Sequence, residues 1–262
     1  MEELTDIKQI QSRILAIASE VHSILVKNNI PYYMIGGTML GAIRHKGFIP
    51  WDDDMDFGIP REYFDKAISI LKKELRQDFQ TLEYNSGDFT TEYAKIEDRN
   101  TAIIEIGRKN MIGLFIDIFP IDISANNNFG LFSRNRWVRE LLIINLFKYY
   151  WPHRMIDKFI ACFIRVLPEN FAKRIALKIA YKKGNYRVNY AGAYREKEII
   201  KSSYWGNPTL YDFENVQLYG PENYDSFLSC LYNDYMQLPP EDKRHSHIIK
   251  CYIKSQDELD QK

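Results

Sequence analysis

The stretch IGGTMLGAIRHKGFIPWDDDMDFGIP, residues 35–60, combines a paired glycine, a basic turn and a cluster of aspartates. Asp54 and Asp56 flank one apolar residue, Met55. Because side chains alternate along a β-strand, the two carboxylates point to one face, while Met55 and Phe57 point to the other, into a core. Adjacent carboxylates repel each other unless a cation lies between them, and hard oxygen ligands of this kind suit Mg²⁺ or Mn²⁺. The stretch therefore predicts a divalent-metal site on a half-buried strand.

Three other kinds of acidic motif fit this cluster less well. An EF-hand requires glycine at the sixth position of its loop and glutamate at the twelfth, where this chain has Phe57 and Tyr63. A solvated acidic loop is disfavoured because apolar residues alternate with the acids. The Asp-x-Asp of a sugar-nucleotide glycosyltransferase normally follows a nucleotide-binding half-domain, and the 51 residues before Asp52 are too few to build one. The favoured interpretation is a nucleotidyltransferase-type site, in which a Gly-Gly turn and one short helix precede the acid pair.

Such a site takes a third acid from a later strand. Residues 114–120, LFIDIFP, are an apolar run with a single carboxylate, Asp117. A buried carboxylate is costly unless it has a charged partner. We therefore predict that Asp117 completes the metal site and acts with Asp54 and Asp56 in catalysis. Asp122 follows in what the pattern indicates is a loop, and it is the weaker candidate.

The glycines precede a predicted phosphate site. Residues 32–35 are typical of a short strand, and residues 38–43 are typical of the short helix that follows it. Main-chain N–H groups at the start of a helix bind phosphate readily. Gly36, Gly37 and Thr38 are therefore predicted to bind the substrate.

The basic turn at residues 44–47 lies next to the acids in the sequence. Arg44 and Lys46 are predicted to hold the phosphates of a donor, since arginine suits bidentate contact. The alternative is that they only neutralise the aspartates. His45 is placed with the substrate-binding residues, and its role as an acid/base group, a phosphate contact or a structural residue stays open.

The remaining pattern divides the chain into three parts. Residues 1–128 are predicted to be an α+β catalytic core, residues 129–190 a helical insert, and residues 191–262 an element that completes the core and ends in a polar tail. Apolar periodicity predicts helices and strands in the first and third parts. The expected helices are 5–28, 61–77 and 223–236, and the expected strands are 79–84, 92–97, 102–106 and 211–219.

Residues 129–190 differ in composition from the rest of the chain. They contain thirteen basic and three acidic residues, a net charge of +10. Their apolar clusters are helical in pattern but shorter than the 18 or more residues of a membrane span. Basic, aromatic and amphipathic character together predict helices that lie on an anionic membrane surface. The alternative is a subdomain that covers the acidic half or binds an anionic acceptor.

Bulk composition excludes some classes of function. The whole chain has 35 basic and 35 acidic residues, so it lacks the overall positive charge that is typical of nucleic-acid-binding proteins. Three widely spaced cysteines suit reduced thiols rather than disulfides or zinc. The first residues show no secretory pattern. We expect a cytoplasmic location, with or without contact with the inner face of the membrane. His22, His245 and His247 are expected to be surface histidines.

The central stretch resembles the signature of the LicD family, which is related to fukutin-type proteins. The matching residues are Gly36-Gly37-Thr38, Leu40-Gly41, Arg44-His45-Lys46-Gly47-Phe48-Ile49-Pro50, Trp51-Asp52-Asp53-Asp54 and Asp56. The resemblance implies a DNA polymerase β-like nucleotidyltransferase core, a mixed sheet with flanking helices. It also implies metal-dependent transfer of a phosphorylated headgroup, such as phosphocholine, from a CDP-linked donor. The acceptor would be a cell-surface glycan (lipopolysaccharide, teichoic acid or capsule) or its lipid-linked precursor, and CMP would be released.

Two rival functions stay open. One is a nucleotidyltransferase that adds NMP to a small acceptor. The other is a non-catalytic scaffold that binds a membrane surface or a glycan. The headgroup is also open, although phosphocholine would require an aromatic box for its quaternary ammonium. Two groups of aromatic residues could supply it: Tyr149, Tyr150 and Trp151, or Tyr204 and Trp205.

Overall fold

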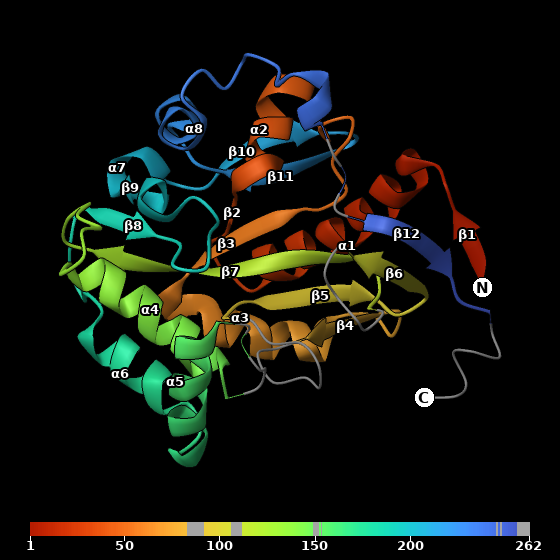
Figure 1. Ribbon diagram of the computed structural model, residues 1–262. Coiled ribbons are helices and arrows are strands. Elements are labelled where there is room, and N and C mark those ends of the chain that lie inside the picture. Colours follow the sequence, from red (N-terminus) through yellow and green to blue (C-terminus); the bar gives the residue numbers. More distant parts are fainter. Residues whose placement is uncertain are drawn as a thin grey trace.

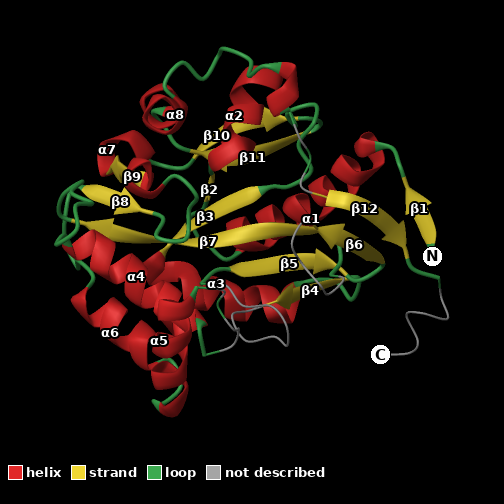
Figure 2. Cartoon of the chain, viewed as in Figure 1, coloured by secondary structure: helices red, strands yellow, loops and turns green. Residues whose placement is uncertain are grey.

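The computed structural model describes residues 1–82, 92–105, 112–148, 152, 154–244, 246 and 248–255. Helices surround a central sheet, so the expected α+β class is confirmed (Figures 1 and 2). The helices are α1 (Ile7–Lys27), α2 (Gly36–His45), α3 (Arg61–Glu74), α4 (Arg134–Leu146), α5 (Met155–Val166), α6 (Phe171–Ile179), α7 (Ser202–Trp205) and α8 (Tyr224–Tyr232), with 3₁₀ turns η1 (Arg195–Glu198) and η2 (Glu241–Lys243). The strands are β1 (Glu2–Leu4), β2 (Tyr33–Met34), β3 (Asp56–Pro60), β4 (Phe79–Leu82), β5 (Ala94–Asp98), β6 (Thr101–Glu105), β7 (Phe115–Ser124), β8 (Tyr186–Val188), β9 (Ile199–Lys201), β10 (Thr209–Phe213), β11 (Val216–Gly220) and β12 (Ile248–Ile253).

The central sheet has the strand order β2-β3-β7-β5-β4, and β8 and β9 extend it from the last residues of β7. β3 and β7 run parallel, whereas β2, β5 and β8 run antiparallel to their neighbours. One face is covered by α1 and α3, which contact β3, β5 and β7 (Figure 1). Because side chains alternate, Asp122 points toward α3, where it meets Arg61, and Asp117 points to the opposite face.

α1 forms because its apolar residues recur every three or four positions and make one continuous stripe. The stripe is buried in the main core and consists of Ile10, Ile14, Ile17, Val21 and Ile24. Asp6 caps the helix by accepting a hydrogen bond from the Lys8 N–H at 2.9 Å. The helix thereby supplies hydrophobic support beneath the central strands, together with α3.

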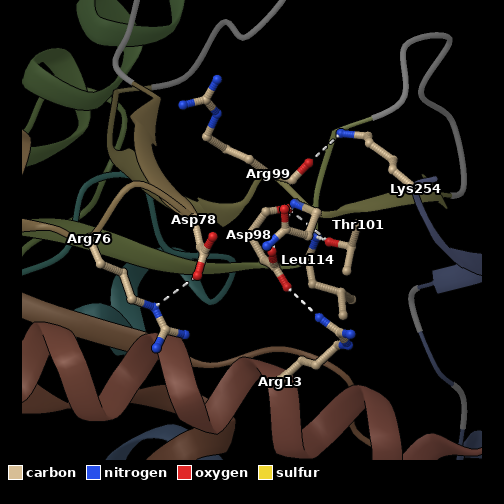
Figure 3. A network of polar contacts seen from close by, with 9 residues as sticks. Arg13, Arg76, Asp78, Asp98, Arg99, Thr101, Leu114 and Lys254 are labelled. Carbon is tan, nitrogen blue, oxygen red and sulfur yellow. Dashed lines mark hydrogen bonds and ion pairs between the residues drawn. The ribbon is translucent and has the colours of Figure 1, made fainter. Parts of the chain in front are cut away.

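A polar network fixes the turn between β5 and β6 (Figure 3). Asp98 accepts hydrogen bonds from Arg13 of α1 and from the Asn100 N–H, both at 2.9 Å. The Thr101 hydroxyl donates to the main-chain oxygen of Asp98 at 2.9 Å and accepts from the Leu114 N–H at 2.7 Å. The start of β7 is therefore held in place relative to α1 and β5, the elements around the site.

The C-terminal part differs from the expectation in two places. Residues 248–253, expected in a polar tail, form β12, the middle strand of a second sheet with the order β1-β12-β6. Residues 211–219, expected to be one strand, form the hairpin β10–β11. The chain reverses at Glu214, which adopts φ +52° without a glycine. The inward-facing residues change parity across the turn, from Tyr211 and Phe213 to Val216 and Leu218, whereas one continuous strand would keep the same parity on each face.

α4, α5 and α6 gather beyond β8, at the end of the molecule opposite β1 and β12 (Figure 1). They contribute to two small hydrophobic clusters separate from the main core, one of which they share with Val188 of β8 and Ile199 of β9. Buried Asn145 of α4 accepts a hydrogen bond from the Lys173 N–H of α6 at 3.2 Å and so joins these two helices. Within the described residues, none of the helices combines the length and the apolar character required to cross a membrane.

Candidate active site

The N-terminus of α2 is built from two glycines. Ile35 precedes the helix in an extended conformation, and Gly36 adopts φ +54°, a region that favours glycine. A Cβ at Gly36 would lie 3.1 Å from Asp56 Oδ2, and a Cβ at Gly37 would lie 3.0 Å from Asp52 Oδ2. The glycines therefore let two carboxylates lie directly against the first turn of the helix.

The parallel pair β3–β7 brings the predicted acids together. Asp56 and Asp117 are partners in the register of the two strands, so their side chains share one face. The Asp56 N–H donates to Thr38 Oγ1 at 2.7 Å, and the Asp117 N–H donates to the main-chain oxygen of Met55 at 2.8 Å. Asp54 lies two residues before Asp56 and lines the same cavity. All three sequence-predicted carboxylates are thus at one site.

Lys95 of β5 is the cation that the sequence did not reveal. It is the register partner of Asp117 on its other side, and its Nζ lies 2.5 Å from Asp117 Oδ1. Its side chain is almost fully buried, with Nζ 3.1 Å from the centroid of the Phe115 ring. A lysine within the buried strand AKIED is a signal that a carboxylate lies nearby, but does not show which one.

The site carries more negative than positive charge. Burial raises the pKa of Asp56 well above its usual value, and Asp54, Asp117 and Asp52 raise it further, while Lys95 acts in the opposite direction. In the part of the chain that the structure describes, no three acidic, histidine or cysteine side chains already form a closed metal-binding group. The carboxylates nevertheless repel one another, and a bound cation would relieve that repulsion.

A cavity of about 540 Å³ opens over the acids. Aromatic rings make up part of its wall, from Trp51, Tyr93, Phe119, Tyr194 and Tyr232. The rings of Tyr194 and Tyr232 meet edge to face with their centroids 5.4 Å apart. Lys243 of η2 also lines the cavity. Rings beside carboxylates are the surroundings that a quaternary ammonium prefers.

Glu198 lines the same cavity from η1. Its Oε1 accepts a hydrogen bond from the Tyr194 N–H at 3.3 Å. Its side chain packs on Gly192, where a Cβ would approach the carboxylate to 2.3 Å. Burial raises the pKa of Glu198 to about 7, against the opposing effects of the Tyr194 hydrogen bond and of Arg139. Glu198 is therefore suited to exchange a proton near neutral pH.

The basic turn lies at the other end of α2, and its residues are not among the described ones that line this cavity. Arg44 donates through Nη1 to the main-chain oxygen of Tyr235 and through Nε to His45 Nε2, both at 2.9 Å. It lines a neighbouring cavity of about 710 Å³. Burial and the charge of Arg44 lower the pKa of His45. Lys46 ends the helix in the left-handed region and is exposed.

Two other aspartates of the sequence motifs have structural partners. Asp53 accepts a hydrogen bond from the Ile248 N–H of β12 at 2.7 Å. Asp122 lies within β7, not in a loop, and forms a bidentate pair with Arg61 at 2.9 and 2.7 Å. Neither lines the cavity over Asp117.

The remaining candidates lie elsewhere. His22 Nδ1 is 2.7 Å from the Tyr32 hydroxyl. Trp205 is buried in the core, with its ring against those of Tyr33 and Phe227, so it does not form an aromatic box at the cavity. Tyr204 packs half-buried against the main core and is not among the residues that line the cavity. Five further candidates fall outside the described residues: His245, His247, Tyr149, Tyr150 and Trp151.

Comparison with known proteins gives matches over both the central stretch and the whole chain. The family described as LicD/FKTN/FKRP, nucleotidyltransferase domain, matches residues 29–156, which include the glycines, the three acids and Lys95. The chain is similar to the lipopolysaccharide cholinephosphotransferase LicD of Haemophilus influenzae, with 30% identity over 97% of this chain and 100% of that protein. A stretch of 46 residues, 18% of this chain, is 52% identical to uncharacterized proteins of Rickettsia prowazekii and Rickettsia typhi, covering 17% and 15% of those proteins.

Proposed function

This chain belongs to the LicD family, and we propose that it transfers phosphocholine from a CDP-linked donor to lipopolysaccharide, or to a lipid-linked glycan precursor, with release of CMP. The relative that aligns with nearly the whole chain is described as a lipopolysaccharide cholinephosphotransferase. The observation that carries the proposal is the gathering of Asp54, Asp56 and Asp117 in one cavity against the glycine start of α2.

We also propose that the core is of the DNA polymerase β-like nucleotidyltransferase type. A short strand, a helix that starts at two glycines, and a parallel pair of strands that carry acids follow one another in β2, α2, β3 and β7. This is the order that the acid-pair motif predicts, and the matching family is itself described as a nucleotidyltransferase domain.

The proposed ligands of one or two Mg²⁺ or Mn²⁺ ions are Asp54, Asp56 and Asp117. The excess of buried carboxylate charge, expressed in the raised pKa of Asp56, supports this assignment. When bound, the metal would neutralise charge that develops on the donor diphosphate. Lys95 would keep Asp117 oriented toward the cavity through its ion pair.

The remaining groups are assigned to the transfer step. The acceptor hydroxyl oxygen forms a bond to the phosphorus of the phosphocholine group, and the bond from that phosphorus to the bridging oxygen breaks, so that CMP leaves with the electron pair. Main-chain N–H groups at the start of α2 hold the donor phosphates. Glu198 takes the proton of the hydroxyl, and Tyr194 and Tyr232 contact the trimethylammonium group.

The test is a panel of CDP-choline, CDP-glycerol and CDP-ribitol with a lipopolysaccharide acceptor, analysed by mass spectrometry. We expect a glycan with added phosphocholine and an equal amount of CMP, both lost when the metal is chelated. Transfer from another CDP-linked donor would keep the chemistry and change the headgroup.

The same experiment distinguishes the rival functions. A product that carries the nucleotide would show NMP transfer instead. Neither product nor CMP from any donor, with the protein folded and the acceptor present, would overturn the enzymatic proposal in favour of a binding scaffold.

A further inference from the structure

α5 is apolar on two sides, and only one of them faces the protein. Its inner side places Ala161 and Ile164 in a buried cluster with residues of α4 and α6. Its outer side, here called the α5 stripe, exposes five large apolar side chains: Met155, Ile156, Phe159, Phe163 and Val166. Phe159 is 71% exposed and Phe163 66%. Residues at this spacing share one face of a helix, so the stripe is continuous.

More apolar surface is exposed at the start of α4. In the turn before α4, Leu131 and Phe132 are exposed, Phe132 to 87%, and Trp137 follows in the first turn of the helix. A groove of about 840 Å³ runs between α4, α5 and η1. Its wall includes Leu131 and Trp137 together with four arginines: Arg136, Arg139, Arg154 and Arg195. The α5 stripe does not line this groove, whose wall on the α5 side consists of Arg154, Asp157 and Ile160.

Charge is distributed unevenly over the molecule. Residues 129–190 carry a net charge of +10, so the rest of a chain with 35 basic and 35 acidic residues carries −10. Next to the stripe, Arg154, Lys158 and Arg165 project from the same helix. Opposite charge on a partner surface would strengthen contact with the stripe.

We propose that the α5 stripe docks on an anionic lipid bilayer, with α5 lying in the plane of the interface. The helix has 12 residues. At about 1.5 Å per residue it is roughly 18 Å long, which is too short to cross a hydrocarbon core of about 30 Å. Its apolar face with flanking cations is the pattern of an interfacial helix. Contact with a second copy is disfavoured, because a symmetric dimer would bring two strongly basic segments together.

The groove behind α5 also comes close to the catalytic cavity. Tyr194 lines the catalytic cavity, and the next residue, Arg195, lines the groove beside α5. A glycan attached to a membrane lipid could then pass along the groove to the cavity. This consequence rests on the proposed function, whereas docking itself does not.

The test uses the full chain and sedimentation with two kinds of vesicle, one of phosphatidylcholine alone and one of equimolar phosphatidylcholine and phosphatidylglycerol. We expect binding to the anionic vesicles at low salt, and weaker binding to the neutral ones. The F159D/F163D variant should lower the partition coefficient by at least about tenfold, because each phenylalanine loses its burial in the interface. K158E/R174E should weaken only the preference for anionic vesicles.

Controls exclude unfolding and general surface effects. Val26→Asp changes an exposed apolar residue at the end of α1 and should leave binding unchanged. F159S/F163S, checked by thermal unfolding, repeats the test without added charge. If the wild-type protein does not sediment with anionic vesicles at low salt, the proposal is wrong. A wild-type dimer that becomes monomeric in F159D/F163D would also overturn it, since the stripe would then be a contact between copies.

Discussion

Two buried aspartates on β7 have contrasting surroundings. Asp122 faces α3, where both of its oxygens accept hydrogen bonds from the Arg61 guanidinium. Burial would lower the pKa of Arg61, but Asp122 raises it above the usual value. Asp117 faces the cavity, where it pairs with Lys95 and lies beside other carboxylates.

The difference is one of charge balance. At Asp122 one cation matches one anion in bidentate geometry, so the pair supports the fold and offers nothing to a ligand. Around Asp117 the negative charge exceeds what Lys95 supplies, and burial keeps the repulsion strong. An incompletely neutralised cluster is suited to bind a cation or exchange a proton. Substitutions at the two places should therefore separate activity from stability.

The largest effect is expected for Asp56→Asn. Loss of this carboxylate should reduce turnover roughly 1000-fold or more, since several kcal/mol of metal-dependent stabilisation disappear. The raised pKa of Asp56 means that its protonated form stabilises the metal-free fold at low pH, and that this stability is lost as pH rises through the folded-state pKa. Asparagine does not ionise, so the variant avoids this loss. Its free energy of unfolding in urea at alkaline pH should equal or exceed that of the wild type. Turnover close to that of the wild type would show that Asp56 is not part of the catalytic site.

Asp122→Asn should give the opposite result. Breaking the buried pair with Arg61 should lower the free energy of unfolding by about 3–5 kcal/mol, measured by urea denaturation. Turnover per folded molecule at low temperature should stay close to wild type. A folded but inactive variant would show that Asp122 belongs to the catalytic machinery, against the contrast drawn here.

Lys95→Met makes the charge imbalance at Asp117 larger. Lys95 orients a proposed metal ligand without being one, and loss of such a partner typically lowers metal affinity or activity by about 10–100-fold. The measurement is the Mg²⁺ concentration dependence of thermal stability and of CMP release, with Lys95→Arg as the control that retains the charge. Unchanged dependence on Mg²⁺ would mean that the ion pair is only structural.

The effect expected at Glu198 is on the pH dependence of stability and turnover. Its folded-state pKa of about 7 exceeds the ordinary value of 4.5. Its contribution to stability is therefore complete below about pH 4.5 and is lost as pH rises through about 7. In Glu198→Gln, the free energy of unfolding should depend less on pH between these two pH values. The rise in turnover near pH 7 should also disappear. Identical pH profiles for the variant and the wild type would exclude Glu198 as the base.

Side-chain alternation explains part of this contrast once β7 is seen to run through both aspartates. Asp117 and Asp122 are five positions apart, so an extended strand through both must place them on opposite faces. The expectation of a loop at Asp122 was wrong because Pro120 lies within β7, where it neither ends the strand nor prevents its pairing with β3. The association of Asp54, Asp56 and Asp117 followed from local patterns of the same kind.

The rest depended on contacts between distant segments. Lys95 reaches Asp117 only because β5 pairs antiparallel with β7, a register that no local pattern reveals. The role of Arg44 and Lys46 at the phosphates stays a prediction. They lie at the opposite end of α2 from the glycines, since the helix is ten residues long and spans roughly 15 Å at about 1.5 Å per residue. Trp205 was a candidate for the cavity wall, yet aromatic character alone does not distinguish a wall from a core.

The hydrogen bond between Asp53 and the Ile248 N–H joins residues 195 positions apart. On the ribosome, the acidic loop is made long before the strand that anchors it. Until β12 has been synthesised, β1 and β6 also lack their shared neighbour and present open strand edges. A nascent or prematurely terminated chain could thus build much of its core without an anchored acidic loop. Synthesis of β12 would then determine when the acidic loop of a newly made molecule is anchored.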